Sequence, residues 1–213
     1  MKELKLAVGV SGSGTLADAM LAAGLPISLV VADRPCVAIS EVAPRYGVEA
    51  RVVDREEYGF NLAELDKFDR HEFSLGMLRI LRNFEIDGFV SAGFGTVLDE
   101  VFFTGNGKYR GYQGLALNSH PALLPAYNGE PHAVRCAIRD GVELTGTTIH
   151  VQTADVDGEP YIVQAELPVL AGDDEASLHE RVKVKERELY VMVLQMWVNF
   201  HAADPTFTWP TKR

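Results

Sequence analysis

Asn118 and His120 lie two residues apart in the stretch LALNSHPALLP, which follows an apolar run and leads into a proline. If this stretch ends a β-strand, both side chains point to one side of it, because side chains alternate along a strand. An amide and an imidazole that converge on one point can stabilise a negative charge that develops on an oxygen atom. The pair therefore predicts an oxyanion site, with a polar pair that only fixes the next loop as the alternative.

A carboxylate that could partner His120 occurs further along the chain, in TADVDGEPYIVQ. Asp157 precedes a glycine turn and a strand-like run, which can hold its side chain rigidly. A neighbouring carboxylate favours the charged form of an imidazole, so His120 could act as a cationic electrophile. Asp155 is an alternative for the same role, and the spacing of the residues leaves both open.

A glycine-rich loop, GVSGSGT, joins an apolar run to a helical pattern near the start of the chain. Backbone N–H groups at a helix N-terminus attract anions, so Gly12, Ser13, Gly14 and Thr15 are candidates for phosphate binding. The loop lacks the third glycine of a dinucleotide fingerprint and the GK[ST] of a Walker loop. A plain glycine-rich turn is an equally good interpretation of the loop by itself.

The other histidines and the cysteines give weaker signals. His150 alternates with apolar neighbours and is interpreted as a buried structural residue, whereas His132 lies in a loop that contacts substrate or solvent. Cys36 and Cys136 are interpreted as small buried residues in a reducing compartment, so no disulfide is expected. No cluster of residues has the spacing of metal ligands, so no catalytic metal is expected.

Apolar runs alternate with helical patterns in the first half of the chain, which favours a parallel sheet with helices on both faces. The expected strands are residues 4–10, 27–33, 50–54, 86–94 and 115–120, and the expected helices are residues 15–24, 37–47 and 75–84. Residues 145–153 and 161–169 alternate and are β-branched, which is typical of antiparallel strands. A last helix is expected from about Ser177 to Phe200, with SLHE as its capping box.

The predicted fold class is therefore α/β, with a doubly wound, mainly parallel sheet and antiparallel edge strands in the C-terminal half. Ligands bind such sheets beyond the carboxyl ends of the parallel strands. The stretches SGSGT, AGFG and NSH each follow an expected strand, so glycine, hydroxyl, amide and imidazole groups gather where a ligand is expected.

The composition favours one globular domain that spans residues 1–213, with 47% hydrophobic and 23% charged residues. A net charge of −10 repels nucleic acids and anionic membranes, so neither is expected as a partner. The basic run HERVKVKERE is interpreted as a solvated helix face, because glutamates are interleaved in it. No apolar segment approaches the roughly 20 residues of a membrane span, and no signal peptide is recognised, which predicts a cytoplasmic protein.

Several stretches together carry a family resemblance: LNSHPALLPAY, VSAGF and the segment that begins with ELTGTTIHVQTADVDGEPY. They resemble the phosphoribosylglycinamide formyltransferases, within the folate-dependent formyltransferase superfamily, most densely from about residue 87 to residue 194. The resemblance implies a Rossmann-like fold with a nucleotide- and phosphate-binding half in residues 1–115. It also implies a catalytic and folate-binding half in residues 116–201 and an irregular tail in residues 202–213.

The resemblance implies that Asn118, His120 and Asp157 are catalytic, and it selects Asp157 over Asp155. The implied reaction transfers a formyl group from formyltetrahydrofolate, the donor co-substrate, to the primary amine of glycinamide ribonucleotide in de novo purine biosynthesis. Asn118 and His120 would stabilise the tetrahedral intermediate, with Asp157 as the partner of His120.

The resemblance also implies binding residues for both substrates. The acceptor, a phosphorylated amine, would contact the glycine-rich loop and the last helix, at Gly12, Ser13, Gly14, Thr15, Lys183 and Glu186. The folate would contact two loops, at Gly95, Val97, Leu98, Ala154 and Val156. No metal is implied, and the expected state is a monomer or a homodimer.

The chain departs from the family pattern in its ligand-binding loops. The glycine-rich loop lacks a usual Asn before Leu16, Gly95-Thr96-Val97-Leu98 stands for the usual Met-Arg-Ile-Leu, and YNGEPHAVRCA replaces a Pro-Gly-Leu-His segment. An arginine that reaches the substrate phosphate in the family falls on His71, next to Arg70, and Glu159 replaces a usual glycine. These changes leave three alternatives open: a different amine acceptor such as an amino sugar, a formyltetrahydrofolate hydrolase, or a folate-binding pseudoenzyme.

Overall fold

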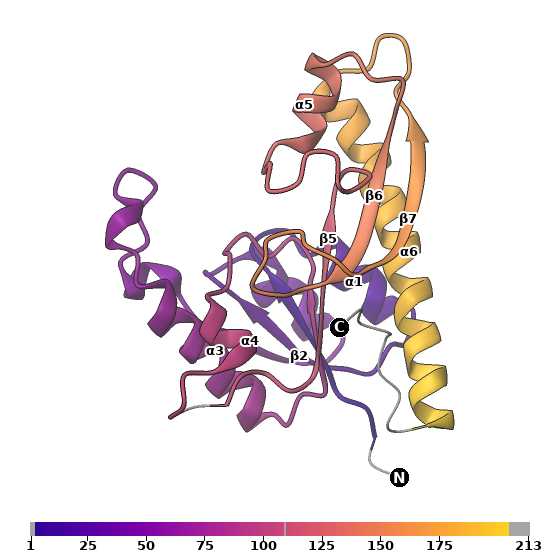
Figure 1. Ribbon diagram of the computed structural model, residues 1–213. Coiled ribbons are helices and arrows are strands. Elements are labelled where there is room, and N and C mark those ends of the chain that lie inside the picture. Colours follow the sequence, from indigo (N-terminus) through magenta and orange to yellow (C-terminus); the bar gives the residue numbers. More distant parts are fainter. Residues whose placement is uncertain (1–2, 109, 205–213) are drawn as a thin grey trace. The chain divides into compact units, whose positions relative to one another are not determined.

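The computed structural model describes residues 3–108 and 110–204. Its strands form a seven-stranded mixed sheet in the order β3-β2-β1-β4-β5-β6-β7 (Figure 1). Pairing is parallel among β1 to β4 and antiparallel among β5 to β7, which confirms the predicted fold class. The chain divides into two compact units, Met1–Ala116 and Leu117–Arg213, which are described separately as the first unit and the second unit.

The first unit alternates strands and helices as predicted. Its strands are β1 (Leu6–Val10), β2 (Ile27–Ala32), β3 (Glu49–Val52) and β4 (Gly88–Ser91). Its helices are α1 (Thr15–Ala22), α2 (Ala43–Arg45), α3 (Arg70–Asn83) and α4 (Glu100–Thr104). β1 and β4 are buried along their whole length, as expected for central parallel strands whose two faces are both covered.

The core of the first unit joins the buried strands to α3. Phe73, Met77 and Leu81 of α3 recur at every fourth position and pack with Phe89 of β4, which places one apolar helix face against the sheet. Three further aromatic side chains, Phe94, Phe102 and Tyr112, extend this cluster. The cluster fixes the strand ends from which the loops of this unit start.

Two helical segments of the first unit differ from the prediction. α3 begins five residues earlier than expected, because the carboxylate of Asp69 accepts a hydrogen bond from the backbone N–H of Glu72 and caps the helix. The helix expected over residues 37–47 is a π-helical turn, Ala38–Val42, followed by the short α2. Pro44 lacks a backbone N–H, so a continuous α-helical ladder cannot pass through it.

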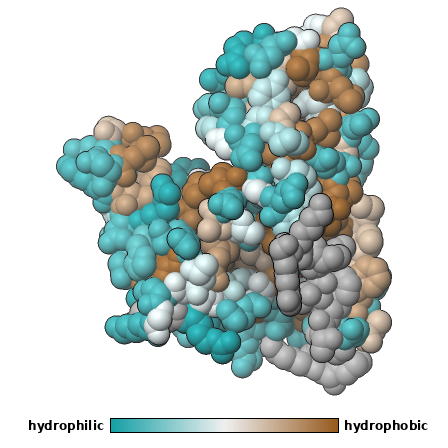
Figure 2. Space-filling model, viewed as in Figure 1, coloured by the Kyte–Doolittle hydropathy of each residue, from teal (hydrophilic) through white to brown (hydrophobic). Residues whose placement is uncertain are grey.

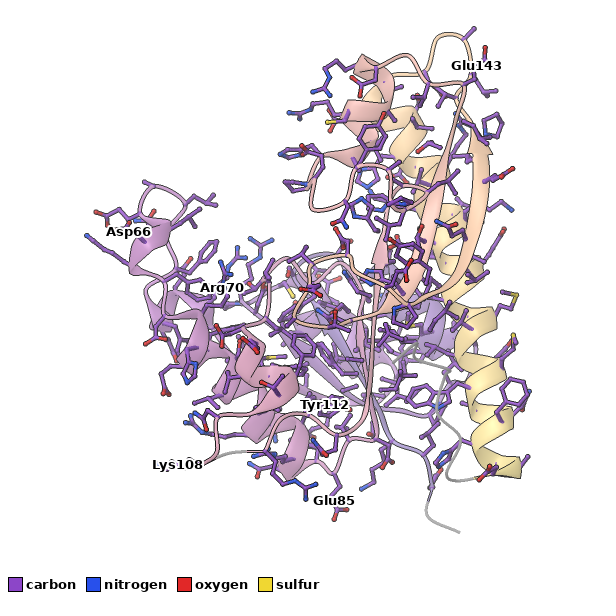
Figure 3. The ribbon with its side chains drawn as sticks, viewed as in Figure 1. Asp66, Arg70, Glu85, Lys108, Tyr112 and Glu143 are labelled. Carbon is purple, nitrogen blue, oxygen red and sulfur yellow. The ribbon has the colours of Figure 1, made fainter. Side chains whose placement is uncertain are left out.

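The segment between β3 and α3 stands out from the rest of the first unit (Figure 1). It holds two 3-10 turns, Arg55–Tyr58 and Leu65–Lys67, and Figure 3 labels Asp66 near its tip. Leu62 and Leu65 are exposed, and Figure 2 shows hydrophobic and hydrophilic surface side by side on this segment. Its base is fixed by aromatic contacts, including an edge-on contact between Phe60 and Phe68.

The second unit holds the antiparallel strands β5 (Leu115–His120), β6 (Leu144–Val151) and β7 (Tyr161–Pro168), with β5 starting at the boundary of the two units. Helix α5 (Ala133–Arg139) and the long α6 (Glu175–Ala203) complete it. α6 runs along β6 and β7 (Figure 1). A small core of Val134, Leu167, Leu178 and Val182 joins α5, β7 and α6.

α6 begins two residues before the predicted start, and its capping box is not the predicted one. The carboxylate of Asp174 accepts from the backbone N–H of Ser177, and the Ser177 hydroxyl accepts from the backbone N–H of Asp174. Ser177 therefore fills the third helical position of the box and not the cap. The basic run lies on α6 with its lysines paired to nearby glutamates, as the prediction of a solvated face implies.

Three smaller expectations have mixed outcomes. Both cysteines are free thiols; Cys136 is buried, but Cys36 is only partly buried. The tail was predicted to be irregular from residue 202, yet α6 continues to Ala203; residues 205–213 lie outside the described residues. Among residues 3–108 and 110–204, no helix is long and apolar enough to cross a membrane.

Candidate active site

The end of β5 presents a row of polar side chains on one face of the sheet. Asn118 and His120 share this face by alternation, and the antiparallel register sets His150 of β6 opposite Asn118 and Thr148 opposite His120. Asn118 is half-buried, whereas His120 is only 4% exposed. The arrangement predicted for Asn118 and His120 is therefore present in the second unit.

His120 is paired with Asp157. Its Nδ1 lies 3.1 Å from Oδ2 of Asp157, and the backbone N–H of Gly129 donates to the same oxygen over 3.1 Å. Because an ionised carboxylate only accepts, the Nδ1 of His120 carries the hydrogen in this pair. The Nε2 of His120 is buried and has no hydrogen-bond partner within the part of the chain that the structure describes. That atom is the one with capacity left for a substrate.

His150 approaches the other oxygen of the same carboxylate. Its Nδ1 lies 3.1 Å from the carbonyl oxygen of Val151, which can only accept, so Nδ1 carries a hydrogen. Its Nε2 lies 3.5 Å from Oδ1 of Asp157 and is a donor there only when the ring is doubly protonated. Asp157 thus lies between two buried imidazoles.

The electrostatics of Asp157 follow from these contacts. Burial alone would raise the pKa of Asp157, but hydrogen bonds from His120 and His150, the charge of His120 and the Gly129 N–H outweigh it. The pKa of Asp157 therefore lies well below its usual value, and the group is ionised at neutral pH. The backbone of Asp157 has a φ of 52°, in the left-handed region, which aspartate tolerates better than most residues.

Asp155, the alternative partner from the sequence, is exposed, and the carboxylate that pairs with His120 is that of Asp157. Its carbonyl oxygen accepts from the N–H of Gly158 and the hydroxyl of Thr153, so it shapes the turn that carries Asp157. Ala154 and Val156, predicted to contact folate, are both exposed in this turn.

The loop after β5 is held by side chains of β6 and β7. The hydroxyl of Thr148 donates to the Ala122 carbonyl over 2.7 Å and accepts from the N–H of Leu124 over 3.0 Å. The amide of Gln164 donates to Thr148 Oγ1 and to the Leu124 carbonyl. The turn that follows His120 is therefore fixed on a regular two-stranded support.

The opposite face of β5 meets α6. Ser119, between Asn118 and His120, points away from them, and its hydroxyl donates to Oε1 of Glu186. Lys183, one turn earlier on α6, lies 2.8 Å from Glu180. Glu186 and Lys183, both predicted to contact the acceptor, therefore lie on α6 as expected, and only Glu186 is tied to β5.

The glycine-rich loop of the first unit runs from β1 into the N-terminus of α1. Gly14 has a φ of 72°, and a side chain there would place Cβ 2.5 Å from the Cβ of Ala38, so position 14 requires glycine.

The other residues of the loop, Gly12, Ser13 and Thr15, are exposed. The first-turn N–H groups of a helix have no partner within it, so these residues can receive an anion. Asp18 would oppose that anion, but Arg45 pairs with it at 3.0 Å.

The loop after β4 is tied to the glycine-rich loop. The N–H of Gly95 donates to the hydroxyl of Ser11 over 2.6 Å, so two loops predicted to bind different substrates share one hydrogen bond. Val97 is exposed, whereas the side chain of Leu98 is buried in the core. A folate contact at Leu98 would therefore involve its backbone.

A buried ion pair lies beside these loops. Asp33 follows β2 and is fully buried; its Oδ2 accepts from the Thr96 hydroxyl over 2.6 Å and from Arg55 Nη1 over 3.2 Å. Arg55 also stacks on the ring of Phe60, with 3.9 Å between its guanidinium carbon and the ring centroid. Thr96, which stands where the family usually has arginine, is thus part of a local network.

Sequence reasoning missed three of these partners. His150 is buried, as predicted, but its approach to Asp157 is not foreseen, and neither are the bond from Ser119 to Glu186 and the ion pair of Asp33 with Arg55. An alternating His150 in a predicted strand next to β5 was the one available signal. Among the described residues, no group of three or more His, Cys, Asp or Glu side chains is arranged to hold a metal ion.

This mixed α/β fold, with an imidazole and a carboxylate paired at the end of a strand, is typical of an enzyme that stabilises charge and moves protons. Residues 4–194 match the formyl transferase family, and the chain belongs to that family. It is a formyltransferase, as the sequence predicted.

The relatives define the branch of the family. The chain is 36% identical over 192 residues to a phosphoribosylglycinamide formyltransferase of Mycobacterium tuberculosis, covering 88% of this chain and 81% of the relative. It is 32% identical to the human trifunctional purine biosynthetic protein adenosine-3, covering 92% of this chain but 18% of that protein.

A solved structure agrees with the sequence relatives. Glycinamide ribonucleotide transformylase 1 of Symbiobacterium toebii superimposes with a TM-score of 0.79 at 30% identity, covering 93% of this chain and 89% of that chain. The predicted membership of the phosphoribosylglycinamide formyltransferase branch is confirmed by these relatives.

Proposed function

We propose that this formyltransferase moves the formyl group of formyltetrahydrofolate onto the primary amine of glycinamide ribonucleotide in purine biosynthesis. The pairing of His120 with Asp157 at the end of β5 carries the proposal, in a chain whose relatives are named for this substrate. We further propose a cytoplasmic protein that acts as a monomer or a homodimer, with no nucleic acid or membrane as partner.

The reaction places a negative charge on the formyl oxygen. Attack of the amine nitrogen on the formyl carbon forms a C–N bond, and breaking the C–N bond to the donor restores the carbonyl. The proton lost by the amine is taken up by the donor nitrogen. The largest contribution the protein can make is to stabilise the charged oxygen in between, with groups fixed in advance.

Asn118 and His120 would provide that stabilisation from one face of β5. The Asn118 amide would donate a hydrogen bond to the oxygen, and His120 would donate from Nε2 in its cationic form. Asp157 would hold the Nδ1 of His120 and favour the cation, since its ionised carboxylate accepts that hydrogen. The same pair would assist transfer of the proton between the two nitrogens.

The binding residues are proposed from the resemblance to the family. Gly12, Ser13, Gly14 and Thr15 would hold the acceptor phosphate through backbone N–H groups, and Lys183 and Glu186 of α6 would contact the acceptor. The folate would contact Gly95, Val97 and the backbone of Leu98 in one loop, and Ala154 and Val156 in the other.

Steady-state formyl transfer tests the proposal. Glycinamide ribonucleotide is compared with the same amine without its phosphate, and formate release is measured in parallel. Efficient transfer that depends on the phosphate supports the proposal. Formate release without transfer would identify a hydrolase and contradict it.

A second candidate keeps the chemistry and changes the acceptor amine. It is favoured by Thr96, which replaces the usual arginine and is bound to Asp33 and Arg55 in the loop region where this chain departs from the family. Absence of turnover with glycinamide ribonucleotide, while formyltetrahydrofolate still binds, would favour this candidate.

A further inference from the structure

Ser119 occupies a position that neither the catalytic pair nor the ligand-binding loops explain. It lies between Asn118 and His120 on β5, but its side chain points to the opposite face of the sheet. There its hydroxyl donates to Oε1 of Glu186, 67 residues further along the chain. The side chain of Ser119 therefore connects β5 to α6.

Tyr190 completes the network one turn after Glu186 on the same helix. Its side chain is fully buried, and it hydrogen-bonds with Ser119. A serine hydroxyl has one hydrogen and two acceptor positions, so Ser119 can hydrogen-bond with Glu186 and with Tyr190 at the same time. The resulting chain of hydrogen bonds joins Tyr190, Ser119 and the Glu186 carboxylate. Such a chain fixes the orientation of the carboxylate at its end.

The charge of Glu186 depends on this contact. Burial raises the pKa of Glu186 above its usual value, and the hydrogen bond from Ser119 and the positive charges of Arg187 and Lys183 offset only part of this rise. Burial also raises the pKa of Tyr190 well above its usual value, so Tyr190 stays a neutral donor. Arg187 and Lys183 lie on α6 beside Glu186, whereas Ser119 acts on this carboxyl from β5 and favours its ionised form.

We propose that Ser119 is a positioning residue for the acceptor: its hydroxyl holds the Glu186 carboxylate in a fixed orientation, ready to receive hydroxyl or amine donors of the substrate. The proposal rests on the proposed function, because Glu186 is there assigned to the acceptor. It assigns the two sides of β5 to different tasks, with charge stabilisation on the face of His120 and acceptor orientation on the face of Ser119.

The matched variants are Ser119→Thr and Ser119→Val. Threonine and valine have nearly the same shape, and both suit a strand, but only threonine keeps the hydroxyl. In Ser119→Val we expect the KM for the acceptor to rise about tenfold relative to Ser119→Thr, which corresponds to one lost hydrogen bond to a charged group. The kcat and the KM for formyltetrahydrofolate should change by less than about twofold, because an interaction equal in ground and transition states affects KM alone.

A direct titration separates this proposal from the proposed function. The carboxyl carbon of Glu186 is followed by NMR in protein with labelled glutamate, and Glu186→Gln assigns the signal. We expect the titration midpoint of Glu186 to lie at higher pH in Ser119→Val than in Ser119→Thr, whatever the enzyme's acceptor is. Ser40→Ala, which removes an exposed hydroxyl from the first unit, should leave the midpoint unchanged.

Two results would overturn the proposal. Equal midpoints in the threonine and valine variants would mean that Ser119 does not act on Glu186. Different midpoints with equal acceptor KM values would mean that the coupling exists but does not serve the acceptor. If the valine variant does not fold, Ser119→Ala is compared with the wild type by the same titration.

Discussion

Asp33 of the first unit and Asp157 of the second unit are both buried, and their carboxylates have partners of different kinds. Asp33 of the first unit accepts from the Arg55 guanidinium and the Thr96 hydroxyl, and its Oδ1 has no partner among the described residues. Asp157 of the second unit lies between the imidazoles of His120 and His150 and also accepts from a backbone N–H.

The difference lies in the chemistry of the partners, which is a guanidinium in the first unit and two imidazoles in the second. A guanidinium offers only hydrogen-bond donors, so Arg55 can pair with Asp33 but cannot accept a proton from a ligand. An imidazole has two ring nitrogens that can donate or accept, which is the chemistry of a general acid or base, while the depressed pKa of Asp157 keeps its carboxylate ionised. Burial of an aspartate is therefore a weak sign of catalysis, and the titratability of its partner is a stronger one.

The largest expected effect is on the second unit. His120→Ala should remain folded and lose at least about a hundredfold in turnover, because it removes a preformed donor to the charged oxygen. Asp157→Asn should lose a similar factor, and the double variant should be little worse than either, since the two residues act as one unit. The measurement is kcat for formyl transfer, with circular dichroism as the check on folding.

Asp155→Asn is the matched control for Asp157→Asn. It removes an exposed carboxylate two residues away in the same turn, and we expect its kcat to stay within about twofold of the wild type. Wild-type turnover in a folded His120→Ala variant would contradict the assigned role of the pair.

The second largest effect is expected on the stability of the first unit. Arg55→Met removes the partner of a fully buried carboxylate, which should lower the free energy of unfolding by about 3–5 kcal/mol. Urea denaturation measures this loss. Combining Arg55→Met with Asp33→Asn removes the unpaired charge, so the double variant should recover part of the loss. A double variant no more stable than Arg55→Met would show that the charge of Asp33 is not the cause.

The third effect is the pH dependence of the stability that Asp157 contributes. The folded-state pKa of Asp157 is depressed, so its contribution to stability is present above the unfolded-state pKa of about 4 and is lost as pH falls towards the folded value. The stability advantage of the wild type over Asp157→Asn should therefore be constant from about pH 7 to 5 and shrink below about pH 4. Urea midpoints at successive pH values measure it, and an advantage that does not shrink on acidification would contradict the assigned ionisation.

The fold was largely predictable because its signals are local. β5 was predicted at its observed bounds, 115–120, since an alternating apolar run ends there at Pro121. The start of α3 was missed because its first turn is charged and its cap, Asp69, is followed by no apolar residue until Phe73. The π-helical turn before Pro44 was missed because a helical pattern of apolar residues does not distinguish the two ladders.

The site was predictable only in its local motifs. Asn118 and His120 share a face by spacing alone, and the family resemblance selected Asp157. The approach of His150 to Asp157 depends on the register of β5 and β6, and the bond from Ser119 to Glu186 depends on the packing of α6. Contacts between residues tens of positions apart follow from tertiary packing, which a single sequence does not contain.

The smallest expected effect tests whether the two units unfold together, as we propose for a single domain. Thr96→Val removes one donor to Asp33 and should lower the free energy of unfolding by about 1–2 kcal/mol. Trp197 is a buried residue of α6 in the second unit, so its fluorescence, measured in a Trp209→Phe background, reports on the unit that does not contain the substitution. In a single cooperative domain, the substitution moves the midpoint of the fluorescence curve to lower urea concentration by the same amount as the midpoint of the circular dichroism curve, because both follow one transition. Alternatively, the fluorescence midpoint stays in place while the circular dichroism transition broadens. That result would show that the two units unfold independently, and that the ion pair of the first unit does not contribute to the stability of the second.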